Sequence, residues 1–320
     1  MDVSEIGEFG LIERLAKAVG ASKPEGLIVG IGDDAAAWRE GDAIVLATTD
    51  TLVEGVHFLP GVTPWADLGW KALAVNVSDI AAMGGEPQYA LVTLALPPQT
   101  PVGAVDELYR GLLECAREYD VTVAGGDVVR APQVMVSVAL IGRADAGARL
   151  MRRDGARAGY VIAVTGTLGG SAAGLRRLRE GVPPDDPLVR AHLRPRPPLA
   201  AARRAVAAGV LCAIDVSDGL LQDLGHVCEA SGLGAVVRAQ AVPLGDELRG
   251  AYPDDALALA CAGGEDYELL LVAPGETLAA LPGLTIIGEM VESGERQAKL
   301  VEASGEEVSL PAAGWDHLRT

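Results

Sequence analysis

The sequence predicts a mixed α/β protein with two domains. Its 320 residues are about twice the length of an average domain, which is roughly 150 residues. From Leu27 to Ile141, β-rich runs alternate with helical stretches, as is typical of mixed α/β layers. A segment rich in Gly, Ala and Arg follows Gly142 and precedes a new strand, YVIAVTG. We therefore expect a first domain over residues 1–148 and a second over residues 149–320.

The elements of the first domain follow from their apolar patterns. The runs AIVLATTD, YALVTLALP and VMVSVALIG are rich in Val, Leu and Ile and predict strands. The segment 64–83 predicts a helix, because apolar residues recur along one face at three- and four-residue steps. These residues are Trp65, Leu68, Ala72 and Val75. Asp79 continues the same face, so we expect its carboxylate to point toward the interior.

The second domain is expected to open with the strand YVIAVTG, which runs into a Gly-rich turn, Gly166 to Gly170, and a helix. Such a turn can hold a phosphate group at the N-terminus of the helix, although a plain strand-to-helix turn explains it equally well. A Pro-rich loop follows from Val182 to Pro198, and strand-like and helical pieces then alternate from Gly209 to Val291. This alternation predicts a second α/β layer.

Composition argues against several classes of function. A net charge of −18 argues against binding to nucleic acids or anionic membranes, which need clustered Lys and Arg. The apolar runs are far shorter than the roughly 20 residues that span a bilayer, and the acidic N-terminus does not resemble a signal peptide. Four widely spaced cysteines lack metal-ligand spacing and predict buried, reduced thiols. We therefore expect a cytoplasmic protein with no nucleic-acid or membrane partner.

Aspartates beside Gly, Ser or Thr recur at the predicted element ends. Each one alone is explained as a turn or cap residue. Asp79 is harder to explain in this way, because a buried carboxylate needs a cation or a donor network. Asp50 ends an apolar strand between two threonines, whose hydroxyls are further oxygen ligands of the kind that Mg²⁺ prefers. The recurring aspartates are Asp33, Asp34, Asp50, Asp79, Asp127, Asp215 and Asp218.

The two common phosphate-binding motifs do not account for these aspartates. The sequence has no G-x-x-x-x-G-K-[ST] motif, and GIGDDA breaks off before completing G-x-G-x-x-G. If the aspartates converge on phosphate groups, several metal ions must lie between the two sets of negative charges. The residues themselves therefore favour an oxygen-rich Mg²⁺ site over either of the two common phosphate-binding motifs.

In order along the chain, short motifs resemble those of the thiamine-monophosphate kinase family, a branch of the aminoimidazole ribonucleotide synthetase-like superfamily. The motifs are GEFGLIERL, GIGDDAA, TTDTLVEGVHFLP, KALAVNVSDIAAMGG, AGGD, TGTLGGSAAGL, HLRPRP, IDVSDGLLQDLGH and GGEDYELL. The resemblance implies the two-domain fold of that superfamily. The mixed sheet of the first domain would join its copy in a homodimer barrel, and the second domain would be an α/β layer.

The resemblance also implies an activity, which is transfer of the γ-phosphoryl group of ATP to thiamine monophosphate with the help of several Mg²⁺ ions. The implied magnesium ligands are Asp34, Thr48, Thr49, Asp50, Asp79, Asp127, Asp215 and Asp218. The implied ATP contacts are Gly126, Asp127, Arg153 and Ser217, with Arg152 as an alternative to Arg153. The thiamine part of the substrate would be contacted by His57, Glu265 and Trp315. No catalytic base is implied, because a phosphate acceptor is already anionic near pH 7.

Other functions fit the sequence less well. A selenophosphate synthetase would carry a reactive Cys or selenocysteine near its N-terminus, whereas the first cysteine here is Cys115. A hydrogenase-maturation relative would end in Cys, whereas this chain ends in Thr320. The segments TTDTLVEGVHF and GGEDYE also fit an aminoimidazole ribonucleotide synthetase less well. A non-catalytic protein that binds divalent cations or nucleotide is the alternative from another class, and it would bind Mg·ATP without forming ADP.

Overall fold

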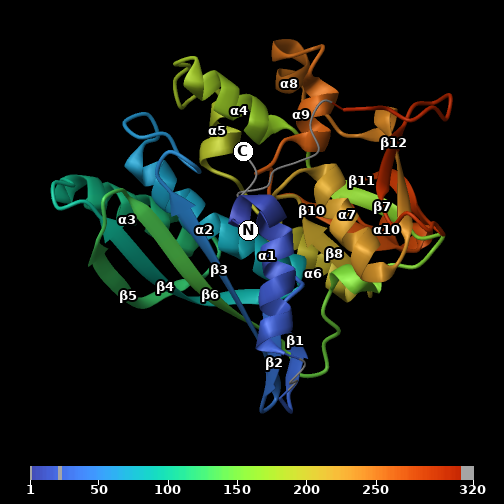
Figure 1. The fold of residues 1–320 in the computed structure, drawn as a ribbon, viewed down its shortest axis with the longest axis horizontal. Helices are drawn as coiled ribbons and strands as arrows, with labels where there is room; N and C mark the ends of the chain where they lie inside the picture. Colours follow the sequence, from blue (N-terminus) through green and yellow to red (C-terminus); the bar gives the residue numbers. More distant parts are fainter. Residues whose placement is uncertain (1, 21–23, 311–320) are drawn as a thin grey trace.

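The computed structural model describes residues 2–20 and 24–310 and contains two six-stranded mixed sheets, one in each half of the chain (Figure 1). This confirms the predicted mixed α/β class. The predicted boundary between residues 148 and 149 falls in the segment that joins the last strand of the first sheet to the first strand of the second. The boundary itself stays a prediction.

The first sheet has the strand order β1-β2-β3-β6-β4-β5, and within it only β4 and β5 are parallel. Its strands are β1 (Leu27–Val29), β2 (Ala36–Glu40), β3 (Ala43–Val53), β4 (Glu86–Leu96), β5 (Thr122–Arg130) and β6 (Met135–Asp145). Along β3, Leu46 and Leu52 are buried. Because side chains alternate between the faces of a strand, Thr48 and Asp50 share this inner face.

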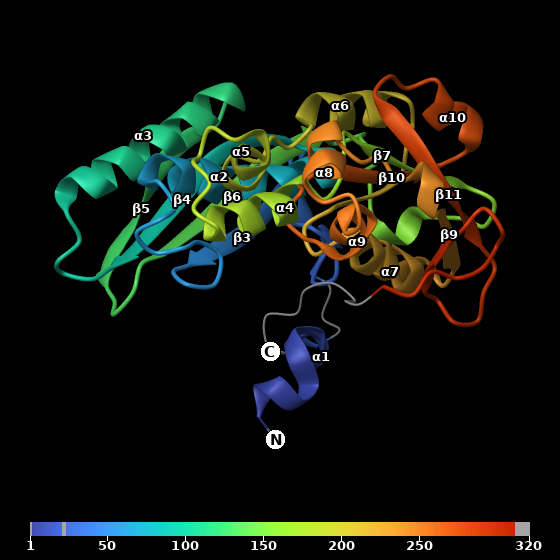
Figure 2. The same cartoon turned by 90° about the horizontal axis from the view of Figure 1, so that it is seen from above.

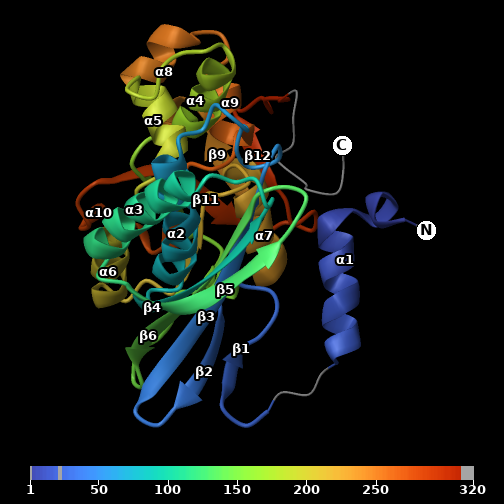
Figure 3. The ribbon, with the colours of Figure 1, turned by 90° about the vertical axis from the view of Figure 1, so that its left-hand side faces the viewer.

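Helices α2 (Trp65–Ala82) and α3 (Val102–Glu118) lie together on one side of the first sheet (Figure 3). They approach each other closely at two glycines. A Cβ atom on Gly69 would lie 1.8 Å from the carbonyl oxygen of Leu108, and one on Gly111 would lie 1.7 Å from that of Ala66. Glycine is therefore required at both positions for this packing distance.

Helix α2 confirms the helix predicted over residues 64–83, but it is buried on nearly every side rather than on one face. The reason is its position, because α2 contacts β3, β4 and β6 of the first sheet and also β8, α5 and α6 of the second half. Apolar residues of both halves accordingly form one continuous core. The sequence pattern showed the helix but not its second set of neighbours.

The second sheet has the strand order β12-β9-β11-β7-β10-β8, and within it only β12 and β9 are parallel. Its strands are β7 (Val161–Thr165), β8 (Cys212–Asp215), β9 (Gly234–Arg238), β10 (Leu269–Ala273), β11 (Leu284–Val291) and β12 (Ala298–Val301). The helices of this half are α4 (Gly170–Arg179), α5 (Pro187–Leu193), α6 (Leu199–Ala207), α7 (Leu220–Ser231), α8 (Asp246–Ala251), α9 (Ala256–Ala262) and α10 (Gly275–Ala279). Two short 3-10 turns, η1 (Arg153–Gly155) and η2 (Ala239–Ala241), complete it.

Helix α1 (Val3–Val19) stands apart from the body of the molecule (Figure 2). The helix is interrupted after its first turn at Gly7, whose φ is +68°. The ring of Phe9 lies 4.7 Å from that of His226 on α7, measured between ring centroids. This contact brings the N-terminal helix to the second half of the chain.

In the two described ranges, no helix is long and apolar enough to cross a membrane. All four cysteines are buried and unpaired, as predicted.

Candidate active site

Three aspartates from separate elements meet beside α2. Asp34 comes from the loop between β1 and β2, Asp79 from the last turn of α2, and Asp215 from the end of β8. One carboxylate oxygen of each lies within 4.8 Å of the others. Asp50 of β3 lies close enough to repel both Asp79 and Asp215. The structure therefore brings four of the predicted magnesium ligands into one carboxylate cluster.

Neighbouring hydroxyl groups hold two of these carboxylates in place. The Thr48 hydroxyl donates a hydrogen bond to Asp79 with an oxygen–oxygen distance of 2.5 Å, so this predicted ligand also lies at the cluster. The Ser78 hydroxyl donates to Asp215 at 2.6 Å. Both hydroxyl oxygens keep lone pairs, and they fix the carboxylates without neutralising them.

Burial makes this cluster electrostatically unfavourable on its own. Burial raises the pKa of Asp34, that of Asp215 to about 7, and that of Asp79 well above its usual range. Repulsion between the carboxylates raises the pKa values of Asp79 and Asp215 further. The Arg153 guanidinium ion-pairs with Asp34 and opposes the shift. One Asp34 oxygen nevertheless remains buried without a hydrogen-bond partner among the described residues. The oxygen-rich site therefore fits further hard cations such as Mg²⁺.

Arg152 and Arg153 point to different places. Arg153 pairs with Asp34 at the carboxylate cluster and lies 3.8 Å from Asp33, whereas Arg152 pairs with Asp154 in the same turn. Of the two arginines that the sequence left as alternatives, Arg153 is the one that the fold places at the site.

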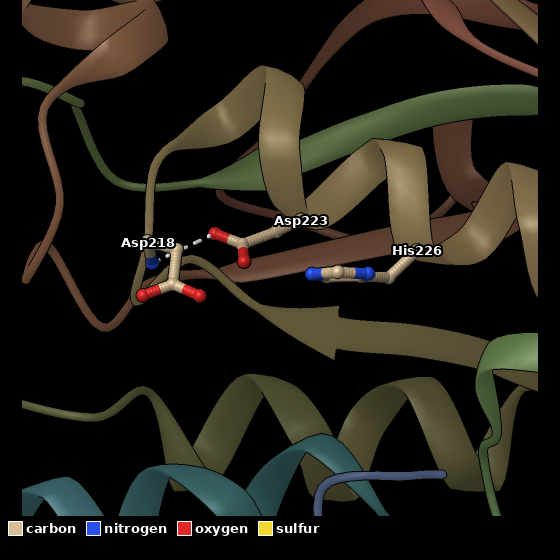
Figure 4. Close-up of side chains that lie close together, drawn as sticks. All are labelled: Asp218, Asp223 and His226. Atoms are coloured by element: carbon tan, nitrogen blue, oxygen red, sulfur yellow. Dashed lines mark hydrogen bonds between the residues drawn. The ribbon is translucent and has the colours of Figure 1, made fainter. Parts of the chain in front are cut away.

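A second group of side chains, Asp218, Asp223 and His226, lies at the start of α7 (Figure 4). Asp223 accepts hydrogen bonds from the backbone N–H groups of Ser217, Asp218 and Gly219 at 3.0–3.1 Å. The Asp223 side chain therefore fixes the turn before α7, and the N-cap residue of this helix is Gly219 rather than Asp218. The Asp218 carboxylate accepts a hydrogen bond from Gln222.

A cavity of ≈ 930 Å³ opens beside the carboxylate cluster, and both halves of the chain line it. Its lining includes the predicted site residues Thr49, Asp50, His57, Asp79, Ser217, Asp218 and Glu265. The volume is within the usual range for a small-molecule site, roughly 300–1,000 Å³. Residues predicted to bind metal, nucleotide and substrate, although they come from distant motifs, thus line the same cavity.

Glu265 is held in this cavity by a buried polar network. The Lys71 ammonium, on a side chain 3% exposed, lies 2.8 Å from one Glu265 oxygen. His192 Nδ1 lies 3.3 Å from the other oxygen and 3.1 Å from the Ser171 hydroxyl. Burial alone would raise the pKa of Glu265, but the Lys71 charge holds it below its usual value. Glu265 therefore stays ionised in a space that can receive a cationic or N–H-donating ligand.

Two loops are joined at this point by their backbones. The N–H of Glu265 donates to the carbonyl of Ser217 at 2.7 Å, and that of Tyr267 donates to Val216 at 2.8 Å. A Cβ atom on Gly264 would lie 2.5 Å from the Ser217 carbonyl oxygen, so glycine permits the approach. Glu265 itself has a φ of +67°, a strained value for a residue with a side chain. The geometry of the Glu265 loop is therefore tied to that of Ser217.

The Gly-rich turn before α4 does not present a free helix N-terminus. The backbone N–H groups of Gly169 and Ser171 donate to the Asp266 carboxylate at 2.6 and 3.1 Å. A protein carboxylate thus occupies the position in which the sequence allowed a phosphate group, so the structure favours the plain-turn interpretation.

Gly126 and Asp127 lie away from the cluster. Both are on β5, an exposed strand at the edge of the first sheet. Asp127 is in register with Thr93, which is in register with Ser137, whose hydroxyl accepts a hydrogen bond from Thr51. This row lies on the outer face of the sheet. A Cβ on Gly126 would lie 1.8 Å from a backbone oxygen of β4, so this glycine also has a packing role.

The remaining predicted residues differ in placement. His57 lines the cavity, and its Nδ1 accepts a hydrogen bond from the Val53 N–H at 3.1 Å. Thr49 lines the cavity but belongs to the outer face of β3, unlike Thr48. Trp315 lies outside the residues that the structure describes.

Sequence reasoning missed Lys71, His192 and Asp223. The signal for Lys71 was available, since it is the single charged residue in the run LGWKALAVNVS. For His192 and Asp223 the local sequence gives no comparable signal, because their importance arises from contacts with Glu265 and with the turn before α7.

Comparison with known proteins gives a consistent result. The chain matches the N-terminal domain of AIR synthase related proteins over residues 32–144 and their C-terminal domain over residues 157–301. It is 36% identical to the thiamine-monophosphate kinase of Aquifex aeolicus (strain VF5), over 99% of this chain and 100% of the relative. It is 40% identical to the enzyme of that name from Escherichia coli (strain K12), over 98% and 99%.

Solved structures agree with this result. The structure titled "AaThiL complexed with AMPPCP and TMP" superimposes with a TM-score of 0.88 at 35% identity, over 99% of both chains. The thiamine-monophosphate kinase of Stenotrophomonas maltophilia K279a superimposes with a TM-score of 0.77 at 35% identity, over 94% of this chain and 98% of that chain. The hydrogenase maturation protein HypE in complex with ATP gives 0.71 at 19% identity over 86% of both chains, which shows a shared fold alone.

Proposed function

Because the chain belongs to the AIR synthase related family and, within it, to the thiamine-monophosphate kinases, we propose that it transfers the γ-phosphoryl group of ATP to thiamine monophosphate. The products are ADP and thiamine diphosphate. The observation that carries the proposal is the carboxylate cluster at the wall of a cavity large enough for both substrates, in a chain similar to these kinases over its full length.

The cluster would hold Mg²⁺ ions through Asp34, Asp50, Asp79 and Asp215, with Asp218 also at the wall of the cavity. The support is chemical, because every donor is oxygen and one buried Asp34 oxygen lacks a hydrogen-bond partner in the described part of the chain. When bound, the ions neutralise the phosphate groups and stabilise the charge that develops during transfer. Thr48 and Ser78 fix the orientation of Asp79 and Asp215.

The protein's own groups then have positioning roles. Arg153 is the nearest guanidinium to the cluster, and its planar donors suit phosphate oxygens once cations balance Asp34. Ser217 lies at the cavity wall, in a turn fixed by Asp223. No side chain needs to remove a proton, because the acceptor phosphate is an anion near neutral pH. Catalysis would therefore come mainly from alignment of the two phosphate groups.

The thiamine end would be recognised by Glu265 and His57, with the predicted contact of Trp315 alongside. The Glu265 carboxylate suits both the amino group and the cationic ring of thiamine, and Lys71 and His192 keep it in place. Rigid support of this kind matches what a specific polar contact requires.

We also propose that the protein is a homodimer. Tyr89 and Leu91 on the outer face of the first sheet are 51% and 45% exposed, an unusual amount of apolar surface for the middle of a sheet. Two copies that pack through this face would bury it. Asp127 lies on the same face, so in such a dimer it would lie at the interface. Light scattering should give the mass of two chains, and a monomer at micromolar concentration would refute the arrangement.

A coupled ADP assay over a panel of phosphate acceptors tests the activity. We expect ADP release that requires Mg²⁺ and thiamine monophosphate together, and that falls to background when thiamine or another phosphate monoester replaces the acceptor. Equal ADP release with and without thiamine monophosphate would refute the substrate. Calorimetric binding of Mg·ATP with no turnover of any acceptor would point to a binding protein instead.

A further inference from the structure

A second cavity, of ≈ 520 Å³, lies between the two halves of the chain. Arg39 of β2, the segment 148–157 and the end of β10 contribute to its wall, and it shares no lining residue with the catalytic cavity. In Figures 1 and 3, β1 and β2 lie at the bottom of the molecule, whereas α4 and α9, which line the catalytic cavity, lie at the top. The two cavities are therefore separate sites.

The second cavity is basic in a strongly acidic protein. Four arginines line it against one carboxylate, that of Asp154, in a chain whose net charge is −18. The arginines are Arg39, Arg149, Arg152 and Arg157. Within residues 2–20 and 24–310, neither Arg149 nor Arg157 has an ion-pair partner, although acidic residues outnumber basic ones in the chain. A local excess of unpaired guanidinium groups is the opposite of what the overall composition would produce.

Two of the four arginines, Arg39 and Arg152, are held in position, whereas Arg149 and Arg157 are exposed. Arg39 donates a hydrogen bond to the carbonyl of Ala146 at 3.1 Å, which keeps its side chain against the cavity wall. The backbone N–H of Arg152 donates to Leu211 at 3.0 Å, which fixes the turn that carries it. The Nε of Arg152 is buried and has no hydrogen-bond partner in the described chain. A buried donor without an acceptor is costly, so this atom indicates that an acceptor belongs in the cavity.

The remaining walls define the kind of anion that fits. Ile28, Leu150, Leu211 and Val272 give the cavity an apolar side, and Tyr160 adds an aromatic ring. The volume falls in the range of small-molecule sites, and guanidinium groups match phosphate oxygens in geometry and charge. A long polyanion is disfavoured by the net charge of −18 of the chain as a whole.

We propose that this cavity binds a small organic phosphate, with the phosphate group on Arg149, Arg152 and Arg157 and the organic part against the apolar side. Binding here does not depend on the proposed kinase activity. The bound anion would sit beside the Arg152–Gly155 turn, in which the next residue, Arg153, pairs with Asp34 of the carboxylate cluster. The site is thus placed to influence the active site through one short segment.

Calorimetry on the full chain in EDTA tests the proposal, because without metal the carboxylate cluster repels anions. The probes are inorganic pyrophosphate, AMP and adenosine. We expect one saturable site for pyrophosphate and for AMP and none for adenosine. The double variant R149Q/R157Q should bind pyrophosphate and AMP about tenfold or more weakly, because each substitution removes a charged hydrogen-bond donor. R190Q, which alters an exposed arginine of α5 outside the cavity, should bind like the wild type.

Several outcomes would overturn the assignment. Absence of saturable binding by the wild-type protein is one, and equal affinity in R149Q/R157Q is another. Binding of adenosine as strong as that of AMP would mean that the phosphate group is not what the cavity recognises. If the double variant fails to fold, the single variants R149Q and R157Q carry the same comparison, and a melting curve without ligand checks their folding. None of these results depends on turnover, so failure here leaves the kinase proposal untouched.

Discussion

At the residue scale, Asp50 offers a direct test of the metal site. Asn has the same shape as Asp but lacks the charge, so Asp50→Asn should remove a metal ligand and relieve repulsion with Asp79 and Asp215. We expect kcat to fall by at least about a hundredfold, because a group that stabilises the charge of the transition state is lost. The melting temperature in EDTA should stay the same or rise. Steady-state kinetics and thermal melting measure the two effects.

A matched control is available in Asp42, an exposed residue in the turn between β2 and β3. Asp42→Asn makes the same chemical change away from the cluster and should leave both measurements unchanged. Near-wild-type ADP production by Asp50→Asn would disprove the metal assignment.

Lys71 gives a second prediction at this scale. Replacing it with Met leaves Glu265 as a buried carboxylate without its cation, which in comparable sites costs about 3–5 kcal/mol. We expect Lys71→Met to raise the KM for thiamine monophosphate by about tenfold or more and to leave the KM for ATP nearly unchanged, because Lys71 lies on the thiamine side. Separate titrations of the two substrates measure this split. If both KM values rose equally, or if neither rose, the positioning role of Lys71 would be contradicted.

Single residues also show how far the sequence can be interpreted. The inward direction of Asp79 was predictable, because helical periodicity fixes which residues share a face. The outward direction of Asp127 was not, because it depends on the register between β4 and β5 and on a bulge that precedes it. The Lys71–Glu265 pair joins residues far apart in the chain, and no local pattern encodes such a contact.

At the element scale, the close contact between α2 and α3 sets the position of the helix that carries Asp79. Gly69→Ala would place a methyl group 1.8 Å from a backbone oxygen of α3, so the helices must separate. Overpacking of this kind costs about 1–3 kcal/mol, and we expect a lower melting temperature together with reduced activity. Chemical denaturation measures the change in the free energy of unfolding.

Gly103, in the first turn of α3, provides the comparison. A Cβ atom there meets no atom within 4 Å, so Gly103→Ala should be neutral or should stabilise the helix by up to about 1 kcal/mol. If the two substitutions had the same effect, the α2–α3 contact could not be the cause.

The elements themselves were mostly predictable, whereas their neighbours were not. Alternating and helical patterns gave the long strands and α2, because these patterns reflect burial. The pattern of α2 predicts one buried face, yet Ala74, Val77 and Ala81 are also fully buried. Such a helix needs partners on both sides, and the second set comes from residues more than a hundred positions later. A pattern within one segment cannot show that.

At the scale of the whole molecule, the buried carboxylates predict how stability depends on pH and magnesium. In the metal-free protein the pKa of Asp215 is raised to about 7 from a usual 3.8, and those of Asp34 and Asp79 are raised as well. Between these values the native state binds protons that the unfolded state has lost, so stability falls as pH rises from about 4 to about 7. A metal ion replaces those protons, so the stabilisation by Mg²⁺ should be larger at pH 8 than at pH 5.

Two histidines make stability rise with pH below about 6.5, which opposes the effect of the carboxylates. Burial lowers the pKa of His192 to about 3 and that of His226 to about 4. The difference between melting temperatures with Mg²⁺ and with EDTA largely removes their contribution, and this difference is the quantity to measure at each pH. Asp215→Asn should reduce this difference between the two melting temperatures. A difference that is independent of pH would mean that these carboxylates do not bind the metal.

The position of α2 has a consequence for synthesis of the chain. This helix is made early, yet Leu269 and Leu271 of β10 belong to the same core. When the ribosome has released the first sheet, which ends at Asp145, part of the surface of α2 still lacks its cover, and more than a hundred further residues must follow before β10 is complete. We therefore expect the nascent first half to expose an apolar helix to chaperones until β10 emerges, and to complete its own folding only then.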